Sequence, residues 1–151
     1  MKSIILLTFL AIAVALNFTH NIKLTYILAL ERCENAKPDS YTIHGLWPQY
    51  NETSWPQYCN ATEEFDYEVL EPLYPQLDKN WQSCPEYNHT ERWFLKHEWL
   101  KHGTCTNFTE YQYFSTGLAL YDIIKWRKIC PMNKKQCLLA IRSELFDKTF
   151  I

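Results

Sequence analysis

The sequence predicts a single α+β domain, because short β-type runs are combined with longer segments of helical periodicity. Two runs rich in β-branched and aromatic residues, 23–30 and 41–44, predict strands. Apolar residues recur at helical spacing over 93–101 and 111–127, which predicts two main helices. The chain has 151 residues, of which 47% are hydrophobic, and this is enough for one sizeable core.

The two strand segments differ in pattern. Residues 23–30 are almost continuously apolar, so we expect a buried strand there. In 41–44 the side chains alternate, which puts Thr42 and His44 on one face of the second strand. We expect this strand to end at 45–48, because Pro48 cannot continue a hydrogen-bonded ladder.

Loops and further helices account for the rest of the chain. We expect, in chain order, a polar loop at 31–40, a loop at 49–62, helices at 63–77 interrupted by Pro72 and Pro75, a loop at 130–137, and a last helix near 138–146.

Residues 1–15 predict a secretory signal peptide. Lys2 precedes an apolar run at 4–16, and Ala13-Val14-Ala15 has the small residues of a cleavage site. This run is shorter than the roughly 20 residues that a transmembrane helix needs. We therefore expect no membrane anchor and one mature domain at 16–151.

The cysteines and asparagines agree with secretion or with the lumen of a lysosome or vacuole. Six cysteines in an oxidising compartment are expected to form disulfides, whose pairing the spacing alone does not define. Asn-x-Ser/Thr sequons predict glycosylation at Asn17, Asn51, Asn60, Asn88 and Asn107. The formal net charge of −2 gives no general affinity for polyanions, so any nucleic-acid site must be local.

Residues 93–105 hold the densest group of chemically active side chains. On a helix, an arc of about 140° contains four of them: His97, Glu98, Lys101 and His102. Trp93, Trp99 and Leu100 fall on the other side, and we expect them to face a core. Gly103 marks the expected end of this helix.

Two ordinary interpretations compete with a functional one. Charged residues on an exposed helix are often a solvated surface, with i,i+4 pairs such as Glu98 and His102. A zinc site of the metalloprotease type needs two histidines at i,i+4. His97 and His102 are five positions apart, so their rings point about 140° apart on a helix. We expect no metal and no other cofactor.

The glycines favour the functional interpretation. The chain has three glycines, and two of them directly follow histidines, at His44-Gly45 and His102-Gly103. Glycine lets a backbone or a ligand approach closely. We therefore expect both histidines beside an open cleft.

Two segments together resemble the active-site segments of the ribonuclease T2 family: Ile43-His44-Gly45-Leu46-Trp47-Pro48 and Phe94-x-x-His97-Glu98-Trp99-x-Lys101-His102-Gly103-x-Cys105. Both match at nearly every defining position and in the family's order, and the resemblance extends over about 24–121. It implies a central antiparallel sheet packed with several helices. It also implies an endoribonuclease that cleaves single-stranded RNA.

The resemblance assigns a role to each candidate catalytic residue. His102 would be the general base for the ribose 2′-OH and His44 the general acid for the leaving 5′-oxygen. His97 would hold the phosphate, while Glu98 and Lys101 would stabilise the transition state. These residue types suit the reaction, because histidine titrates near neutrality and a negative phosphorane needs polar and cationic groups in place. The products would be a 2′,3′-cyclic phosphate and then a 3′-phosphate, and DNA, which lacks the 2′-OH, should be spared.

The resemblance also suggests base-binding residues and disulfides. Trp47 would stack on a base and Phe94 would flank a second base, with core packing as the alternative for both. Gln49 stands where many relatives carry an acidic residue, so base preference is open. The family pattern pairs Cys59 with Cys105 and Cys33 with Cys84, which leaves Cys130 with Cys137 by elimination.

Two departures from the family pattern support a second hypothesis. After Leu30 the family usually has a Trp-Pro segment and another cysteine, where this chain has Glu31-Arg32-Cys33. Relatives normally continue past Ile151, so we expect a C-terminally shortened domain. The alternative is a catalytically inactive secreted glycoprotein that binds RNA or a receptor. A purely structural disulfide-rich domain would leave both histidine motifs unexplained. We expect a monomer whose partner is single-stranded RNA and whose pH optimum is mildly acidic.

Overall fold

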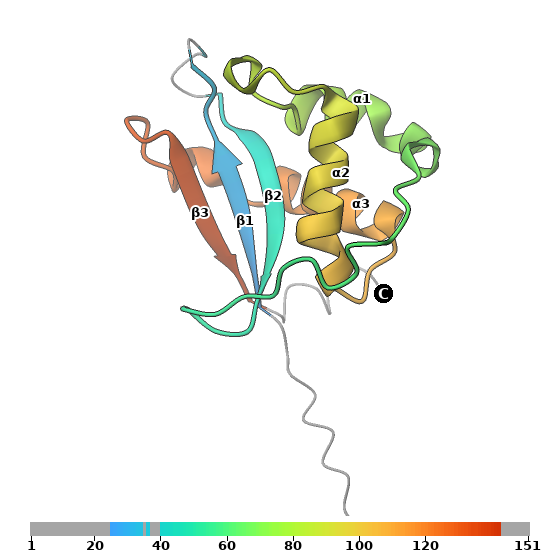
Figure 1. The fold of residues 1–151 in the computed structure, drawn as a ribbon. Helices are drawn as coiled ribbons and strands as arrows, with labels where there is room; N and C mark the ends of the chain where they lie inside the picture. Colours follow the sequence, from blue (N-terminus) through green and yellow to red (C-terminus); the bar gives the residue numbers. More distant parts are fainter. Residues whose placement is uncertain (1–24, 35, 37–39, 143–151) are drawn as a thin grey trace, which may run out of the picture.

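The computed structural model describes residues 25–34, 36 and 40–142, and its centre is a three-stranded antiparallel sheet (Figure 1). The strands are β1 (Thr25–Glu31), β2 (Thr42–Gln49) and β3 (Gln136–Ile141), in the order β2-β1-β3. The predicted signal peptide and the sequon at Asn17 lie outside the described residues. No helix of the described part is both long enough and apolar enough to cross a bilayer.

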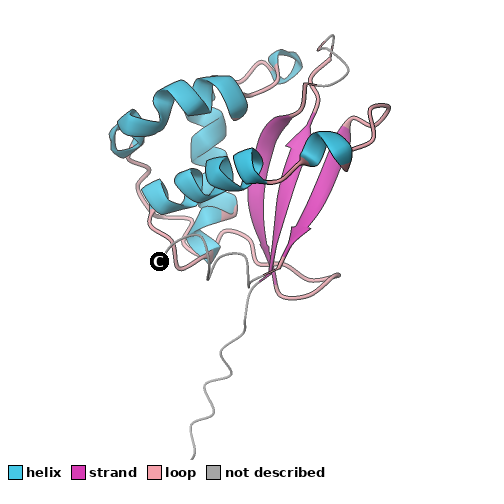
Figure 2. Cartoon of the chain, turned by 180° about the vertical axis from the view of Figure 1, so that it is seen from behind, coloured by secondary structure: helices cyan, strands magenta, loops and turns pink. Residues whose placement is uncertain are grey.

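Three α-helices accompany the sheet: α1 (Tyr74–Asn80), α2 (Glu91–Lys101) and α3 (Glu110–Ile123). Of four short 3-10 helices, one precedes α1 (Tyr67–Leu73), two lie between the α-helices (Pro85–Tyr87 and Gly103–Cys105) and one follows α3 (Trp126–Lys128). In the rear view of Figure 2, the short helix after α3 lies in front of the sheet, and α3, which leads to it, contacts β1 and β2. The expected α+β architecture is therefore present.

The core lies between the sheet and the helices. Leu28 of β1 pairs with Leu46 of β2 and with Leu139 of β3, and all three side chains are buried. They belong to one apolar cluster with aromatic and aliphatic residues of α3, among them Phe114 and Leu118. Burial of each such side chain stabilises the fold by about 1.5–3 kcal/mol.

The segment predicted to be helical at 63–77 is displaced along the chain: residues 63–66 are not helical, and the helices run from Tyr67 to Asn80. A 3-10 helix at Tyr67–Leu73 is capped by Asp66, whose side chain accepts a hydrogen bond from the Glu68 amide. Pro72 lies inside this helix, and Pro75 lies in the first turn of α1. Proline is tolerated in the first turn of a helix, so Pro75 is compatible with the start of α1. Pro72 lies inside its helix, where proline removes a backbone hydrogen-bond donor.

The prediction that β2 ends at 45–48 is wrong, because β2 continues through Pro48 to Gln49. In the described sheet β2 has a neighbour on one side only, and proline is compatible with such an edge strand. The pairing with β1 shifts register between Ala29 and Leu30, which pair with Gly45 and Ile43. His44 is therefore the additional residue of a β-bulge, a feature that redirects side chains and often lies beside active sites.

The prediction of a last helix near 138–146 is also wrong for its described part. Residues 136–141 form β3, in which Leu139 and Ile141 are buried while Leu138 and Ala140 are exposed. This alternation has the period of a half-buried strand, and β1 offers the free edge that the segment pairs with. Residues 143–146 lie outside the described residues.

All three expected disulfides are present. Cys59–Cys105 joins the loop after β2 to the end of the α2 region, and Cys33–Cys84 joins the end of β1 to the loop before α2. Cys130–Cys137 closes the short loop that leads into β3. The first two links tie the strands to the helix that carries the second motif.

Candidate active site

Helix α2 begins with a side-chain cap and presents a buried face that includes a charged residue. The Thr90 hydroxyl accepts a hydrogen bond from the Trp93 amide, which satisfies one of the free N–H groups of the first turn. The buried side chains of this helix are Phe94, Leu95, Glu98 and Trp99. The carboxyl group of Glu98 is thus enclosed among apolar side chains.

The predicted division of α2 into an active face and a core face needs two corrections. Trp93 does not face the core, since it is 47% exposed and its ring lies parallel to that of His97, with centroids 5.3 Å apart. His102 lies just past the last helical residue, with φ −120° and ψ −46°, and its side chain is buried. The helix turns Glu98 rather than Trp93 inward, because Phe94, Leu95 and Trp99 define the apolar stripe.

The two glycines after the histidines allow close packing. A Cβ atom at Gly45 would overlap the Glu98 carboxylate and the Trp47 indole, and one at Gly103 would overlap the Trp99 ring. The space beside each glycine is therefore occupied by neighbouring side chains rather than by an open cleft. Gly45 lets the carboxylate of α2 approach β2.

Four predicted residues come together at this contact. The Trp47 indole donates a hydrogen bond to Glu98 Oε2 at 3.1 Å, and Glu98 Oε1 lies 3.6 Å from His44 Nε2. The ring of Trp47 lies over that of His102 with centroids 5.3 Å apart and meets the edge of His44 at 5.5 Å. Histidines from β2 and from the end of α2 thus flank one indole and one carboxyl group.

His97 and Lys101 complete the predicted set. His97 is half-buried, and burial, followed by the positive charge of Lys101, lowers its pKa. Lys101 also acts electrostatically on His44, Glu98 and His102. The other four predicted catalytic residues therefore all lie within electrostatic reach of Lys101.

The surroundings of His44 and His102 shift the pKa values of these two histidines in opposite directions. Burial, together with the charge of Lys101, lowers the pKa of His102 to about 3. Burial also lowers the pKa of His44, but contact with Glu31 and the charge of Glu98 outweigh this, so the His44 pKa is raised. Burial raises the pKa of Glu98 to about 7. In mildly acidic solution His102 is thus neutral while His44 carries a proton.

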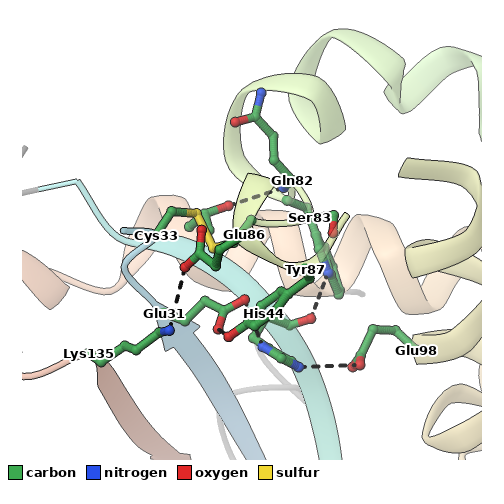
Figure 3. A network of polar contacts seen from close by, with 12 residues as sticks. Glu31, Cys33, His44, Gln82, Ser83, Glu86, Tyr87, Glu98 and Lys135 are labelled. Carbon is green, nitrogen blue, oxygen red and sulfur yellow. Dashed lines mark hydrogen bonds and ion pairs between the residues drawn. A yellow bond between two sulfur atoms is a disulfide. The ribbon is translucent and has the colours of Figure 1, made fainter. Parts of the chain in front are cut away.

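Glu31 is a site residue that sequence reasoning missed. Its side chain is fully buried, and its Oε1 lies 2.9 Å from His44 Nδ1. Figure 3 shows Glu31 and Glu98 on opposite sides of the His44 ring, with Tyr87 beside Glu31. The sequence signal is an acidic residue directly after an apolar run. The predicted start of the polar loop at residue 31 is wrong, because Glu31 is the last residue of β1.

The base-binding predictions have different outcomes in space. Phe94 is buried in the core and meets the His44 ring edge-on at 5.5 Å, so its position does not support stacking on a base. Trp47 is partly exposed and lines a pocket of about 420 Å³. The lining also includes Ile27, Gln49, Trp55, Lys101 and His102. This pocket opens directly beside the candidate general base.

Metal-binding residue types converge at one place in the described part of the chain, at Cys33, Cys84 and Glu86. Both sulfur atoms there belong to a disulfide, so they are not available as thiolate ligands. Four predicted glycosylation asparagines are exposed: Asn51, Asn60, Asn88 and Asn107. Asn88 has a positive φ of 54°, a conformation that asparagine adopts more readily than most residues.

Comparison with known proteins identifies the family. The sequence model of the Ribonuclease T2 family matches residues 15–138, and the chain belongs to this family. Among curated proteins it is similar to intracellular ribonuclease LX of Solanum lycopersicum (42% identity over 85 residues) and to ribonuclease T2 of Homo sapiens (36% over 89 residues). These matches cover 54% and 56% of this chain, and 35% and 33% of the two relatives.

Solved structures agree with this assignment. The chain is similar to a crystal structure of RNase NT in complex with 5′-AMP, with a TM-score of 0.54 and 30% identity over 74% of this chain and 64% of that one. It is also similar to human RNase T2, with a TM-score of 0.57 and 28% identity over 70% and 59% of the two chains. The ribonuclease T2 fold is thereby confirmed, while the chain spans about a third to a half of the length of the curated relatives it matches.

Proposed function

We propose that this protein is a secreted endoribonuclease that cleaves single-stranded RNA by transphosphorylation, without a metal ion. The observation that carries the proposal is the placement of two histidines around the Trp47 indole, with surroundings that lower the pKa of His102 and raise that of His44. A general base and a general acid need this contrast at one pH. Family membership supports the reaction class independently.

In the proposed reaction His102 removes the proton from the ribose 2′-OH, and the oxygen attacks the adjacent phosphorus. The P–O5′ bond then breaks, and His44 gives its proton to the leaving 5′-oxygen. The product is a 2′,3′-cyclic phosphate, which water later opens to a 3′-phosphate. DNA has no 2′-OH and is not a substrate.

The remaining residues stabilise the negative phosphorane. Lys101 provides a positive charge, and His97 binds the phosphate through a ring nitrogen. The pKa of Glu98 lies near 7, so in mild acid this carboxyl group carries a proton and donates a hydrogen bond to a phosphoryl oxygen. The proposed substrate base enters the pocket beside Trp47, whose indole offers a stacking surface.

We also propose a route through the secretory pathway to the exterior or to a lysosomal or vacuolar lumen. The three disulfides support an oxidising compartment. The relatives include both an intracellular and an extracellular ribonuclease of Solanum lycopersicum. The proposed compartment is therefore inferred from this chain's own sequence, from its signal-like N-terminal residues and its exposed sequons.

The test is cleavage of a single-stranded RNA by the oxidised, purified chain in excess EDTA. We expect cleavage by the wild type and a loss of at least about 100-fold in kcat/KM for His44→Ala and for His102→Ala. His89→Ala is the control for the loss of an exposed histidine. His89 stacks on Trp93 and its charge acts on His97, so we expect a change far smaller than in the other two variants. A folded wild-type chain that binds RNA without cutting it would instead support the inactive, RNA-binding alternative.

A further inference from the structure

We infer that Glu31, held in place by Tyr87, is a positioning residue that keeps the His44 imidazole protonated and fixes its orientation. The inference rests on the proposed role of His44 as general acid. Neither the family motif segments nor the predicted active face of α2 includes these two residues.

The geometry around Glu31 places one oxygen on each partner. Its Oε1 lies 2.9 Å from His44 Nδ1, and its Oε2 accepts a hydrogen bond from the Tyr87 hydroxyl at 3.0 Å. Within the described residues neither His44 Nδ1 nor Glu31 Oε1 makes a hydrogen bond of regular geometry, so their contact at 2.9 Å is a close ion pair between two buried atoms. A fully buried carboxylate is costly unless a cation accompanies it, and His44 is the side chain in position to be that cation.

The segment that carries Tyr87 is fastened to the end of β1. Cys84, which precedes its short helix, forms the disulfide with Cys33. Glu86 forms an ion pair with Lys135 across 3.5 Å, and the same lysine lies 5.4 Å above the Tyr87 ring. These links restrict the Tyr87 hydroxyl, and therefore the Glu31 carboxylate, to one arrangement beside His44 (Figure 3).

His44 meets charged groups from several elements. Glu31 of β1 faces Nδ1, and Glu98 of α2 faces Nε2 at 3.6 Å. The positive charge of Lys101 lowers the His44 pKa and so opposes the effect of the two carboxyl groups. The charge of His44 in turn lowers the pKa of His97 and of His102. The raised pKa of His44 shows that the carboxyl groups prevail over burial and Lys101.

Glu31 and Glu98 would then have different roles, because they face different nitrogens of the His44 ring. The Glu98 carboxyl group faces the nitrogen that must reach the leaving oxygen, whereas Glu31 faces the nitrogen behind it. A carboxylate on Nδ1 fixes the ring and favours the imidazolium, while Nε2 stays directed toward the reacting atoms. The alkaline limit of activity should therefore depend on Glu31.

The test compares wild type with Glu31→Gln, which keeps the shape of the side chain and removes its charge. The histidine resonances are followed by NMR as a function of pH, and kcat/KM for single-stranded RNA is measured over the same range. We expect the His44 titration and the alkaline limb of kcat/KM to move together toward lower pH. Glu31→Asp, which retains the charge, should bring both the His44 titration and the alkaline limb partly back to their wild-type positions.

Glu64→Gln is the matched control, because Glu64 is an exposed glutamate that is not part of the contacts among Glu31, Tyr87, Glu86 and Lys135 described above. It should leave both curves unchanged. An unchanged His44 titration in a folded Glu31→Gln variant would overturn the inference. A shifted titration in a chain that does not cleave RNA would preserve the Glu31–His44 pair and reject the proposed function.

Discussion

At the scale of single residues, the site separates two identical side chains by their surroundings. His102 is buried beside Lys101, which holds its pKa far below the ordinary histidine value. His44 lies between two carboxyl groups. The contact with Glu31 and, while Glu98 is ionised, the charge of Glu98 raise the His44 pKa although the ring is largely buried. The two histidines thus have the protonation states in mildly acidic solution that the proposed base and acid require.

The low pKa of His102 also predicts how stability depends on pH. The unfolded chain binds a proton on this histidine near pH 6.5, whereas the folded chain resists protonation down to about pH 3. The contribution is therefore complete above pH 6.5 and is lost as the pH falls toward 3, by up to about 1.4 kcal/mol per pH unit. Glu98 acts in the opposite sense, since its raised pKa contributes stability below pH 4.5 that is lost as the pH rises through about 7.

We expect His102→Asn to remove the acid-side loss. Urea unfolding at pH 7, 5.5 and 4 should show the free energy of unfolding falling more steeply with acid in the wild type than in this variant. His89→Asn, at an exposed histidine, should follow the wild type. Parallel curves for wild type and His102→Asn would show that His102 is not held neutral by the fold.

At the scale of secondary-structure elements, the bulge in β2 decides where His44 points. The register shift opposite Ala29 and Leu30 leaves His44 without a paired residue on β1. Its backbone carbonyl accepts a hydrogen bond from the Trp81 indole at 3.0 Å, and Trp81 is fully buried. The bulge is therefore held by an interaction with the core side of the molecule.

Helix α3 supports this interaction from behind. A Cβ atom at Gly117 would overlap the Trp81 ring, so glycine at this position makes room for the indole. Glycine normally weakens a helix by about 1 kcal/mol relative to alanine. At Gly117 the lower helix propensity is offset by the packing of Trp81, whose indole holds the His44 backbone.

We expect Gly117→Ala to lower both stability and activity. Overpacking against Trp81 costs about 1–3 kcal/mol, which exceeds the gain of about 1 kcal/mol in helix propensity. Thermal unfolding and kcat/KM of the variant measure the two effects. Ser115→Ala, two residues earlier on α3, is the control for propensity alone. An equal rise in stability for both variants would contradict the role assigned to Trp81.

At the scale of the whole molecule, the sequence predicted which residues form the site better than it predicted how the elements around the site pack. His44 and the α2 cluster could be predicted because the family motif is local and its residues are few. The Trp93 orientation could not, since the burial of a helix face depends on which elements pack against it. Glu31 escaped for the same reason, because its burial depends on the fold around the end of β1.

The strands were predicted where a segment carries its own signal. The apolar run of β1 is long enough to be unambiguous, whereas β3 is a short apolar segment that periodicity alone does not separate from a helix. Its strand conformation comes from pairing with β1, which a distant part of the chain provides. The continuation of β2 through Pro48 likewise depends on its position at the described sheet edge.

The central claim is that a 2′-OH attacks the adjacent phosphate at this site. The most direct measurement incubates the oxidised chain, in EDTA at pH 5.5, with a labelled single-stranded RNA and with the DNA of the same sequence, and identifies the product ends by mass spectrometry. The account predicts fragments ending in a 2′,3′-cyclic phosphate from the RNA and an intact DNA. Cleavage of the DNA, or RNA fragments that never pass through the cyclic phosphate, would contradict it.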